Sequence, residues 1–197
     1  MNFIDLARAL GFSFTSGVNL YATVAILGLA VRYGWVDLPA QFQVFDNDLV
    51  IYGAIAMYLV EFLADKIPWV DSMWDAVHTV IRPLGGALVA VAAVGEASPA
   101  VEGLVAILGG SVAATSHFAK AGSRAVVNTS PEPVSNSIVS LLEDLLVFGL
   151  GLLALLFPVV ALILVVVLLA IILFFSVRLF RAARRRLRRA GPVTART

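Results

Sequence analysis

The chain has 197 residues, of which 60% are hydrophobic and only 14% charged, and its mean hydropathy is +0.96. An ordinary soluble domain carries about 25% charged residues, so this composition excludes that class and is typical of an integral membrane protein. There is no cysteine, which excludes disulfide bonds and thiolate chemistry. The net charge of +1 hides an uneven distribution, because eight of the fourteen basic residues follow Phe175.

Six hydrophobic segments are long enough to cross a bilayer, which takes about 20 helical residues. We therefore predict an all-α integral membrane protein, a bundle of about six transmembrane helices. The predicted spans are residues 6–32, 49–66, 74–95, 101–121, 138–157 and 159–178. They form one transmembrane domain over residues 1–178, followed by an Arg-rich cytoplasmic tail over residues 179–197.

The last two spans are separated only by Pro158. No charge occurs from Leu145 to Val177, and a single helix of that length would overshoot the bilayer. Pro158 can end one helix and allow a tight reversal. The alternative is one long tilted helix over residues 138–178, which would leave five spans.

Loop charges favour six spans with both termini in the cytoplasm. If the Arg-rich tail is cytoplasmic, six spans also place Arg8, Lys66, Lys120 and Arg124 on that side. The outer loops then carry mostly acidic residues, which are Asp37, Asp46, Asp48, Glu96 and Glu102, and this is a positive-inside pattern. We expect a multi-pass protein of the bacterial inner (cytoplasmic) membrane.

The expected partners are the lipid bilayer and, at the Arg-rich tail, anionic lipid headgroups. The tail also fits a simple stop-transfer anchor that fixes orientation. No aromatic or groove-reading element accompanies the arginines, so nucleic-acid binding is not expected. The small residues Gly86, Ala90 and Ala93 share one face, which would suit tight helix packing or a homodimer.

Polar residues follow single helical faces into the predicted spans. In the third span, Asp71, Asp75, His78 and Arg82 recur at spacings of four, three and four. The fourth and fifth spans carry similar stripes, and Glu61 and Asp65 end the second span four residues apart. We predict a polar binding site built from Asn19, Asp71, Asp75, His78, Arg82, His117, Lys120, Arg124, Asn136, Ser140, Glu143 and Asp144.

These stripes lie in the same half of the membrane in the six-span topology. A charge at the bilayer centre costs at least about 3 kcal/mol, so the stripes should face one another or water. One polar cavity open to the cytoplasm satisfies this requirement. The alternatives are interfacial residues that snorkel to water and, for Asn19 and the serines, hydrogen bonds between helices.

Recognisable catalytic motifs are absent from the sequence. It has no phosphate-binding loop, dinucleotide fingerprint or nucleophile elbow, so we expect no enzyme and no cofactor. The two histidines lack metal-motif spacing, and no metal site is predicted, although His78 with Asp75, or His117 with Glu143, would suit metal ligation or a proton relay. Residues 10–13 match 108–111 in spans predicted to run in opposite directions, which suggests a possible inverted repeat.

Four segments resemble the signatures of a known family. They are Ser-Gly-Val-Asn-Leu-Tyr-Ala-Thr (16–23), Ser-His-Phe-Ala-Lys-Ala-Gly-Ser-Arg (116–124), Asn-Thr-Ser-Pro-Glu-Pro-Val-Ser-Asn-Ser (128–137) and Leu-Leu-Glu-Asp (141–144). The chain is similar to a small bacterial integral membrane protein family catalogued as a domain of unknown function, number four-one-two-six. The resemblance covers nearly the whole chain before the tail. It implies a stand-alone membrane domain and no particular activity.

Two functions are consistent with these observations. The first is a small inner-membrane transporter whose cytoplasm-facing site holds an anionic or zwitterionic solute or a lipid headgroup. In this reading Arg82, Lys120 and Arg124 hold the anionic group, while His78 and the carboxylates carry protons or pair with the cations. The second is a structural or assembly protein whose charges pair between helices or with a partner subunit.

Overall fold

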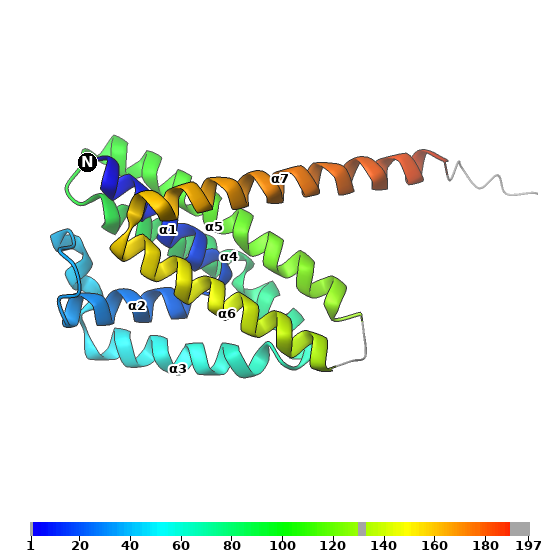
Figure 1. Ribbon diagram of the computed structural model, residues 1–197, viewed down its shortest axis with the longest axis horizontal. Helices are drawn as coiled ribbons and strands as arrows, with labels where there is room; N and C mark the ends of the chain where they lie inside the picture. The colour runs from blue at the N-terminus through cyan, green and yellow to red at the C-terminus, as the bar shows by residue number, and fades with distance from the viewer. Residues whose placement is uncertain (1, 130–132, 190–197) are drawn as a thin grey trace, which may run out of the picture.

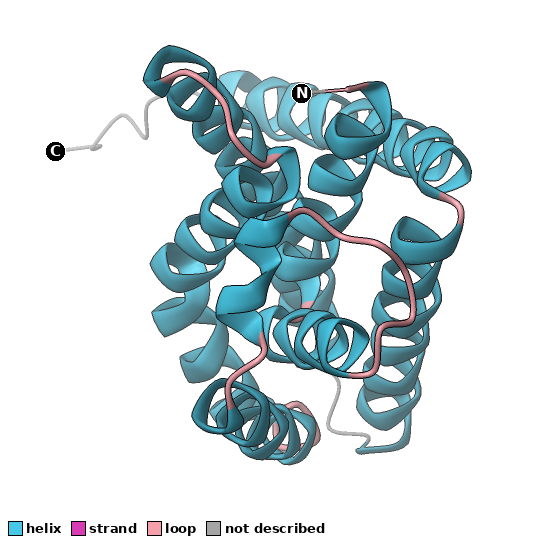
Figure 2. Cartoon of the chain, turned by 90° about the vertical axis from the view of Figure 1, so that its left-hand side faces the viewer, coloured by secondary structure: helices cyan, strands magenta, loops and turns pink. Residues whose placement is uncertain are grey.

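A computed structural model describes residues 2–129 and 133–189, which fold into a bundle of α-helices (Figures 1 and 2). The helices are α1 (Phe3–Val18), α2 (Leu20–Arg32), α3 (Asp48–Ala64), α4 (Pro68–Val94), α5 (Pro99–Val127), α6 (Pro133–Leu156) and α7 (Pro158–Arg189), with a short 3-10 helix η1 (Ala40–Phe45). Over these described residues there is no strand, which agrees with the predicted all-α class.

Four helices are long and apolar enough to cross a membrane. They cover Pro68–Val94, Pro99–Val127, Val134–Leu156 and Pro158–Ala182. Each of the four corresponding helices, α4 to α7, starts with proline, whose missing N–H costs nothing in the first turn. The most apolar window of α7 is only 11% buried, so most of its surface is left for lipid contact. The protein is therefore built as an integral membrane protein.

The first predicted span, residues 6–32, is not one helix. The backbone is extended at Asn19, with φ −149° and ψ 102°, and this residue separates α1 from α2. The Asn19 side-chain oxygen accepts a hydrogen bond from the Ala22 N–H at 2.9 Å, which caps the start of α2. At 1.5 Å per residue, α1 and α2 are about 24 and 20 Å long, and each is shorter than a hydrocarbon core of about 30 Å.

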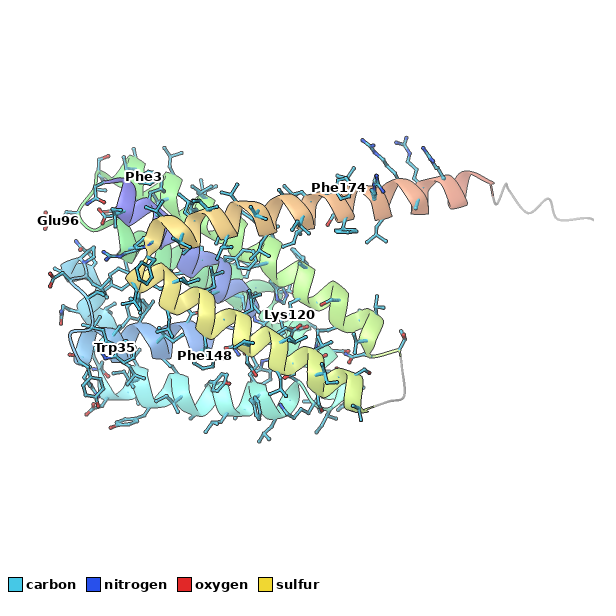
Figure 3. All side chains as sticks on the ribbon, viewed as in Figure 1. Phe3, Trp35, Glu96, Lys120, Phe148 and Phe174 are labelled. Carbon is cyan, nitrogen blue, oxygen red and sulfur yellow. The ribbon has the colours of Figure 1, made fainter. Side chains whose placement is uncertain are left out.

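The two short helices form a hairpin and do not continue in one direction. Arg8 in α1 donates a hydrogen bond to the Asp37 carbonyl beyond the end of α2, and the Phe12 ring packs against Phe42 of η1. Phe3, Trp35 and Glu96 lie together at one end of the bundle, which we call the N-terminal end (Figure 3). The hairpin therefore enters from that end, turns at Asn19 and returns to it.

This reversal changes the direction of α1 relative to α5. Ser116 donates a hydrogen bond to the Phe14 carbonyl and Lys120 to the Val18 carbonyl, so positions on α1 and α5 advance together. The two helices are parallel, and the inverted relationship predicted between residues 10–13 and 108–111 is wrong. The start of α1 and the end of α7 lie at opposite ends of the bundle (Figure 1), whereas a single first span would have placed them together.

The end of the bundle opposite the N-terminal end is the tail end, where α7 runs past the other helices (Figure 1). It includes the turn between α3 and α4 and the end of α5 at Val127 (Figure 1). The break between α6 and α7 lies at Phe157, as predicted, so the alternative of one long helix over 138–178 is wrong. The predicted tail, residues 179–197, begins inside α7, and its last eight positions lie outside the described residues.

Small residues let α1, α4 and α5 pack closely. A Cβ atom at Gly17 would overlap the Ala113 carbonyl and the Ser116 hydroxyl. Gly86 and Gly109 similarly leave room for Ala113 and Ala90. Close packing through small residues is a common way to hold helices together in a membrane, where the hydrophobic effect does not drive them together. The face containing Gly86 and Ala90 is buried inside the chain, as expected for tight helix packing.

The hairpin predicts which side of the membrane the N-terminus occupies. Because the chain has no cysteine, single-cysteine variants are labelled at one site only. We expect Phe3→Cys to react with an impermeant maleimide from the same side as Ala100→Cys and from the opposite side to Thr129→Cys, as measured in sealed right-side-out and inverted vesicles. Labelling of Phe3→Cys together with Thr129→Cys would instead indicate one continuous first span.

Candidate functional site

Charged and polar side chains meet between the hairpin turn and the tail end of the bundle. They come from α3, α4 and α5, with α6 closing one side. We call the directly bonded group the ionic network, which comprises Glu61, Asp65, Asp71, Asp75, Arg82, His117, Lys120 and Arg124. Every one of these residues is at most 5% exposed.

Arg82 lies at the centre of the network and is 0% exposed. Its guanidinium donates hydrogen bonds to Glu61 at 2.8 Å and to Asp75 at 3.1 Å. It also lies 2.9 Å from Nδ1 of His117, and since a guanidinium only donates, this nitrogen must accept. His117 Nε2 then donates to Thr79, whose hydroxyl donates to the Asp75 carbonyl. His117 is thus a neutral imidazole with its proton on Nε2.

Lys120 connects the network to the hairpin. Its ammonium group donates to Glu61 at 3.2 Å, to Asp65 at 3.1 Å and to the Val18 carbonyl at 3.3 Å. Val18 is the last residue of α1, where unsatisfied carbonyls carry the negative end of the helix dipole. The broken end of α1 therefore stabilises a buried cation on α5 (Figure 3).

Arg124 holds the tail end of the network together. Its Nε lies 3.1 and 3.2 Å from the two carboxylate oxygens of Asp71. Its Nη atoms donate to the Asn136 carbonyl at 2.9 Å and to the Asp65 carbonyl. Asn128 donates a further hydrogen bond to Asp71 at 2.6 Å. One arginine on α5 thus joins α4, α6 and the end of α3.

His78 belongs to a separate polar group beside the hairpin turn. Its Nδ1 donates to the Trp74 carbonyl at 2.7 Å, so its Nε2 is left to accept from the Tyr21 hydroxyl at 2.9 Å. The Trp74 indole stacks on the imidazole, with ring centroids 4.6 Å apart. Tyr21 is in the first turn of α2, so this group connects α4 to the returning half of the hairpin.

The α6 side of the site has fewer bonds than the α4 and α5 sides. Oε2 of Glu143 lies 3.8 Å from the Lys120 ammonium and 4.0 Å from Arg124 Nε, which is too far for a hydrogen bond. Ser140 is 0% exposed, yet its hydroxyl has no hydrogen-bond partner within the described chain. The same holds there for Asn136 Oδ1 and Asp144 Oδ2.

Carboxylates outnumber cations in and around the network. The cations are Arg82, Lys120 and Arg124, with Lys66 beside Asp144, and the carboxylates are Glu61, Asp65, Asp71, Asp75, Glu143 and Asp144. With both histidines neutral, four positive and six negative formal charges give a net charge of −2. Uncompensated charge is costly away from water, so this site favours protons or another positively charged species.

Two small clefts flank the network on different sides of α5. One has a volume of about 220 Å3 and lies between α4 and α5, where Asp71, Asp75 and Arg124 line it. The other has a volume of about 210 Å3 and is bordered by α1, α5, α6 and α7, with Lys120 and Glu143 in its wall. Both clefts are small, and Arg82 lines neither of them.

The predicted site residues occupy three kinds of position. Asp71, Asp75, Arg82, His117, Lys120 and Arg124 belong to the network, and Asn136 binds its edge through its carbonyl and through its amide, which donates to the Asp65 carbonyl. Ser140, Glu143 and Asp144 line the α6 side, while His78 pairs with Tyr21. Asn19 caps α2 at the hairpin turn. Among the described residues, Arg82 is fully buried and lines neither cleft beside the network, so the structure does not show the single open cavity that the sequence predicted.

Two network residues were left out of the predicted site. Glu61 binds both Arg82 and Lys120, and Asp65 binds Lys120. Their spacing of four residues signalled a shared helical face, but their place at the end of a span suggested interfacial residues. The Val18 carbonyl, which binds Lys120, is a main-chain group, so no residue type in the sequence indicated its role.

No metal site is formed by the residues that the structure describes. Among them, no group of three or more His, Cys, Asp or Glu side chains is arranged to hold a metal ion. The network's contacts are ion pairs and hydrogen bonds between protein groups.

Comparison with known proteins identifies the family. The family model described as Domain of unknown function (DUF4126) matches residues 6–178, which is most of the chain, so the protein belongs to this family. No curated protein matches the chain, and no solved structure matches it. The described contacts are therefore the basis for a functional proposal.

The network predicts a large stability cost when its central cation is removed. Arg82→Met would leave Glu61 and Asp75 buried without their shared partner. We expect it to destabilise the fold by about 3–5 kcal/mol, as measured by thermal unfolding in detergent. The matched control is Arg32→Met, which removes an exposed pair with Asp46 and Asp48 and should change the melting temperature much less. Equal melting temperatures for both variants would show that the network contributes little to stability.

Proposed function

We propose that this member of the DUF4126 family is a multi-pass membrane transporter, and that the described conformation is its occluded state. The ionic network is the site that binds the transported or coupling species. In this conformation most of the network is buried, and the two clefts that reach its edge are small.

The proposed topology has a hairpin followed by five crossing helices. Helices α1 and α2 enter from one side and return to it, and α3 to α7 cross the membrane. The side with the arginines of α7 is then cytoplasmic and also has Lys66, Lys120 and Arg124. The opposite side has more acids than bases, including Asp37, Glu96 and Glu102, so the charge pattern obeys the positive-inside rule. The membrane we propose is a bacterial inner membrane.

The observation that carries the proposal is the position of the hairpin turn. Irregular backbone is tolerated within a membrane only where it is buried in protein or lines a cavity. Here the break at Asn19 ends α1 on Lys120 of the ionic network. Transporters use interrupted helices in this way, because free carbonyls and N–H groups at the break contact the transported ion or solute. A helix packed only for stability has no need to end there.

The charge balance supports a positively charged coupling species. Arg82, Lys120 and Arg124 already bind carboxylates at 3.2 Å or less, so none of them is free to receive an anionic solute in this state. The excess of two negative charges is instead reduced when a proton or cation enters. An anionic or zwitterionic solute would require one of the existing ion pairs to open.

The second candidate is a structural or assembly protein. The observation in its favour is the pairing of the same three cations, since a static bundle also needs its buried charges neutralised. The two functions differ in whether the network ever becomes accessible to water.

Cysteine accessibility separates the two functions without knowledge of the solute. Ser16 and Ser140 are each 0% exposed, and within the described chain their hydroxyls have no partners, so serine-to-cysteine changes there are conservative. We expect Ser16→Cys and Ser140→Cys to react slowly with a small impermeant methanethiosulfonate in both right-side-out and inverted vesicles. The reagent reaches these cysteines from both sides if the hairpin region opens alternately to the two sides of the membrane.

The controls mark the two sides of the membrane. Ala100→Cys and Thr129→Cys are exposed at the N-terminal end and the tail end, and each should react in one vesicle orientation only. Protection of both buried cysteines in both orientations would support the structural alternative. Reaction from a single side only would contradict alternating access.

A further inference from the structure

Glu143 occupies an unusual place on the α6 side of the site. Its side chain is 14% exposed, and it lines the 210 Å3 cleft together with Ser123 of α5 and Leu168 and Ile172 of α7. On the other side it faces Lys120, which is 2% exposed at its side chain. Glu143 therefore lies between a cleft and the buried network, with access to both.

The other carboxylates of the network are already committed to cations. Asp71 binds Arg124, Asp75 binds Arg82 and Asp65 binds Lys120, all at 3.2 Å or less. Glu61 binds two of these cations at once. Beside the network, Glu143 faces Lys120 and Arg124 at 3.8 and 4.0 Å without a hydrogen bond to either, and its neighbour Asp144 also has an oxygen without a partner in the described chain. A change in the charge of Glu143 therefore alters an attraction and breaks no existing hydrogen bond.

The charged groups around Glu143 come from every neighbouring polar element. Lys120 and Arg124 face it from α5 and favour its ionised form. The carboxylates around it are those of Asp65 at the end of α3, Asp75 of α4 and Asp144, which follows it on α6. Because cations and carboxylates act on it in opposite directions, small movements of α6 change the preferred charge of Glu143.

We propose that Glu143 is the proton-binding residue of the transport cycle, which makes protons the coupling species of the proposed transporter. The inference rests on the proposed function and names what its site binds. A proton passes from water in the cleft to a carboxylate oxygen of Glu143, which becomes a neutral carboxyl group. The network then has one negative charge fewer, and nothing else is consumed.

Protonation loosens the contact between α5 and α6. Ionised Glu143 attracts Lys120 and Arg124, both on α5, and so holds α6 against that helix. Neutral Glu143 exerts no such attraction, while Lys120 stays bound to Asp65, Glu61 and the Val18 carbonyl. Separation of α6 from α5 then widens the cleft towards the network. Release of the proton restores the attraction and closes the cleft.

The test follows accessibility as a function of pH. Ser140 lies three residues before Glu143 on α6. We expect the Ser140→Cys variant to be labelled faster as the pH falls. The change reaches up to about tenfold per pH unit if one proton is linked to opening. Each rate is divided by that of the exposed Thr129→Cys at the same pH, which removes the pH dependence of thiol reactivity. Adding Glu143→Gln should give fast labelling with no remaining pH dependence.

The matched control is Glu102→Gln, which changes a glutamate near the N-terminal end. It should leave the pH dependence of Ser140→Cys labelling intact. A second measurement is infrared difference spectroscopy of the purified protein between acid and alkaline buffer. A protonated carboxyl band should be present in the starting chain and in Glu102→Gln, and absent in Glu143→Gln.

The outcomes distinguish this inference from the proposed function. Labelling from both sides that does not depend on pH would leave transport standing and overturn the role of Glu143. The role of Glu143 is likewise overturned if the pH dependence survives Glu143→Gln, or if the carboxyl band does. Replacement of the pH effect by a dependence on sodium, measured with sodium chloride against choline chloride at constant pH, would assign the site to a metal cation and overturn proton binding. Complete protection of Ser140→Cys at every pH would overturn the proposed function itself.

Discussion

The contact between the end of α1 and Lys120 is the interaction on which the rest of the site depends. A helix that ends inside the bundle leaves carbonyl groups without partners, and a buried ammonium group needs acceptors in the absence of water. The two groups satisfy each other, because the Val18 carbonyl accepts a hydrogen bond from the Lys120 ammonium group at 3.3 Å. Asn19 completes the turn by capping α2 with its side chain. Once Lys120 is fixed in this way, Glu61 and Asp65 are fixed with it, and through Glu61 so is Arg82.

Much of the helical architecture could be predicted from the sequence. Pro158 and the charge-free stretch around it indicated two helices, because one helix of that length does not fit a bilayer. The hairpin was not predicted, because residues 6–32 are apolar enough for a span and the break is determined by what α1 meets. Two local signals pointed to it, namely the capping preference of Asn19 and the nearby Gly17, whose missing Cβ lets α1 touch α5. Neither is sufficient without knowledge of that neighbour.

The sequence predicted most residues of the candidate site, but it did not predict which of them pair with one another. Periodicity alone placed Asp71, Asp75 and Arg82 on one face of α4. The structure pairs Asp75 with Arg82 on that face, and it joins Arg82 to Glu61 of α3 and Asp71 to Arg124 of α5. Sequence spacing cannot show which stripe faces which, so it did not show that Glu61 bridges two cations. It also led us to expect that the cations would be free to bind an anionic solute. The pairing makes carboxylates the surplus groups, and this changes the class of species that the site favours.

Differences in packing show where movement costs least. Helices α1, α4 and α5 meet through Gly17, Gly86 and Gly109, where any added Cβ would overlap a neighbour, so their relative positions are tightly constrained. Helix α6 packs closely on α1 where Gly11 meets Ala154, but around Ser140 and Glu143 its polar contacts with the core are fewer. Its Ser140 hydroxyl has no partner within the described chain, and Glu143 is beyond hydrogen-bonding distance of its cations. Its firmest polar connection is Asn136, whose carbonyl accepts from Arg124 and whose amide donates to the Asp65 carbonyl, near the tail end. Helix α6 is therefore the wall that can separate from the core without breaking a side-chain hydrogen bond of Ser140 or Glu143, and its polar face contains the carboxylate that senses the charge of that core.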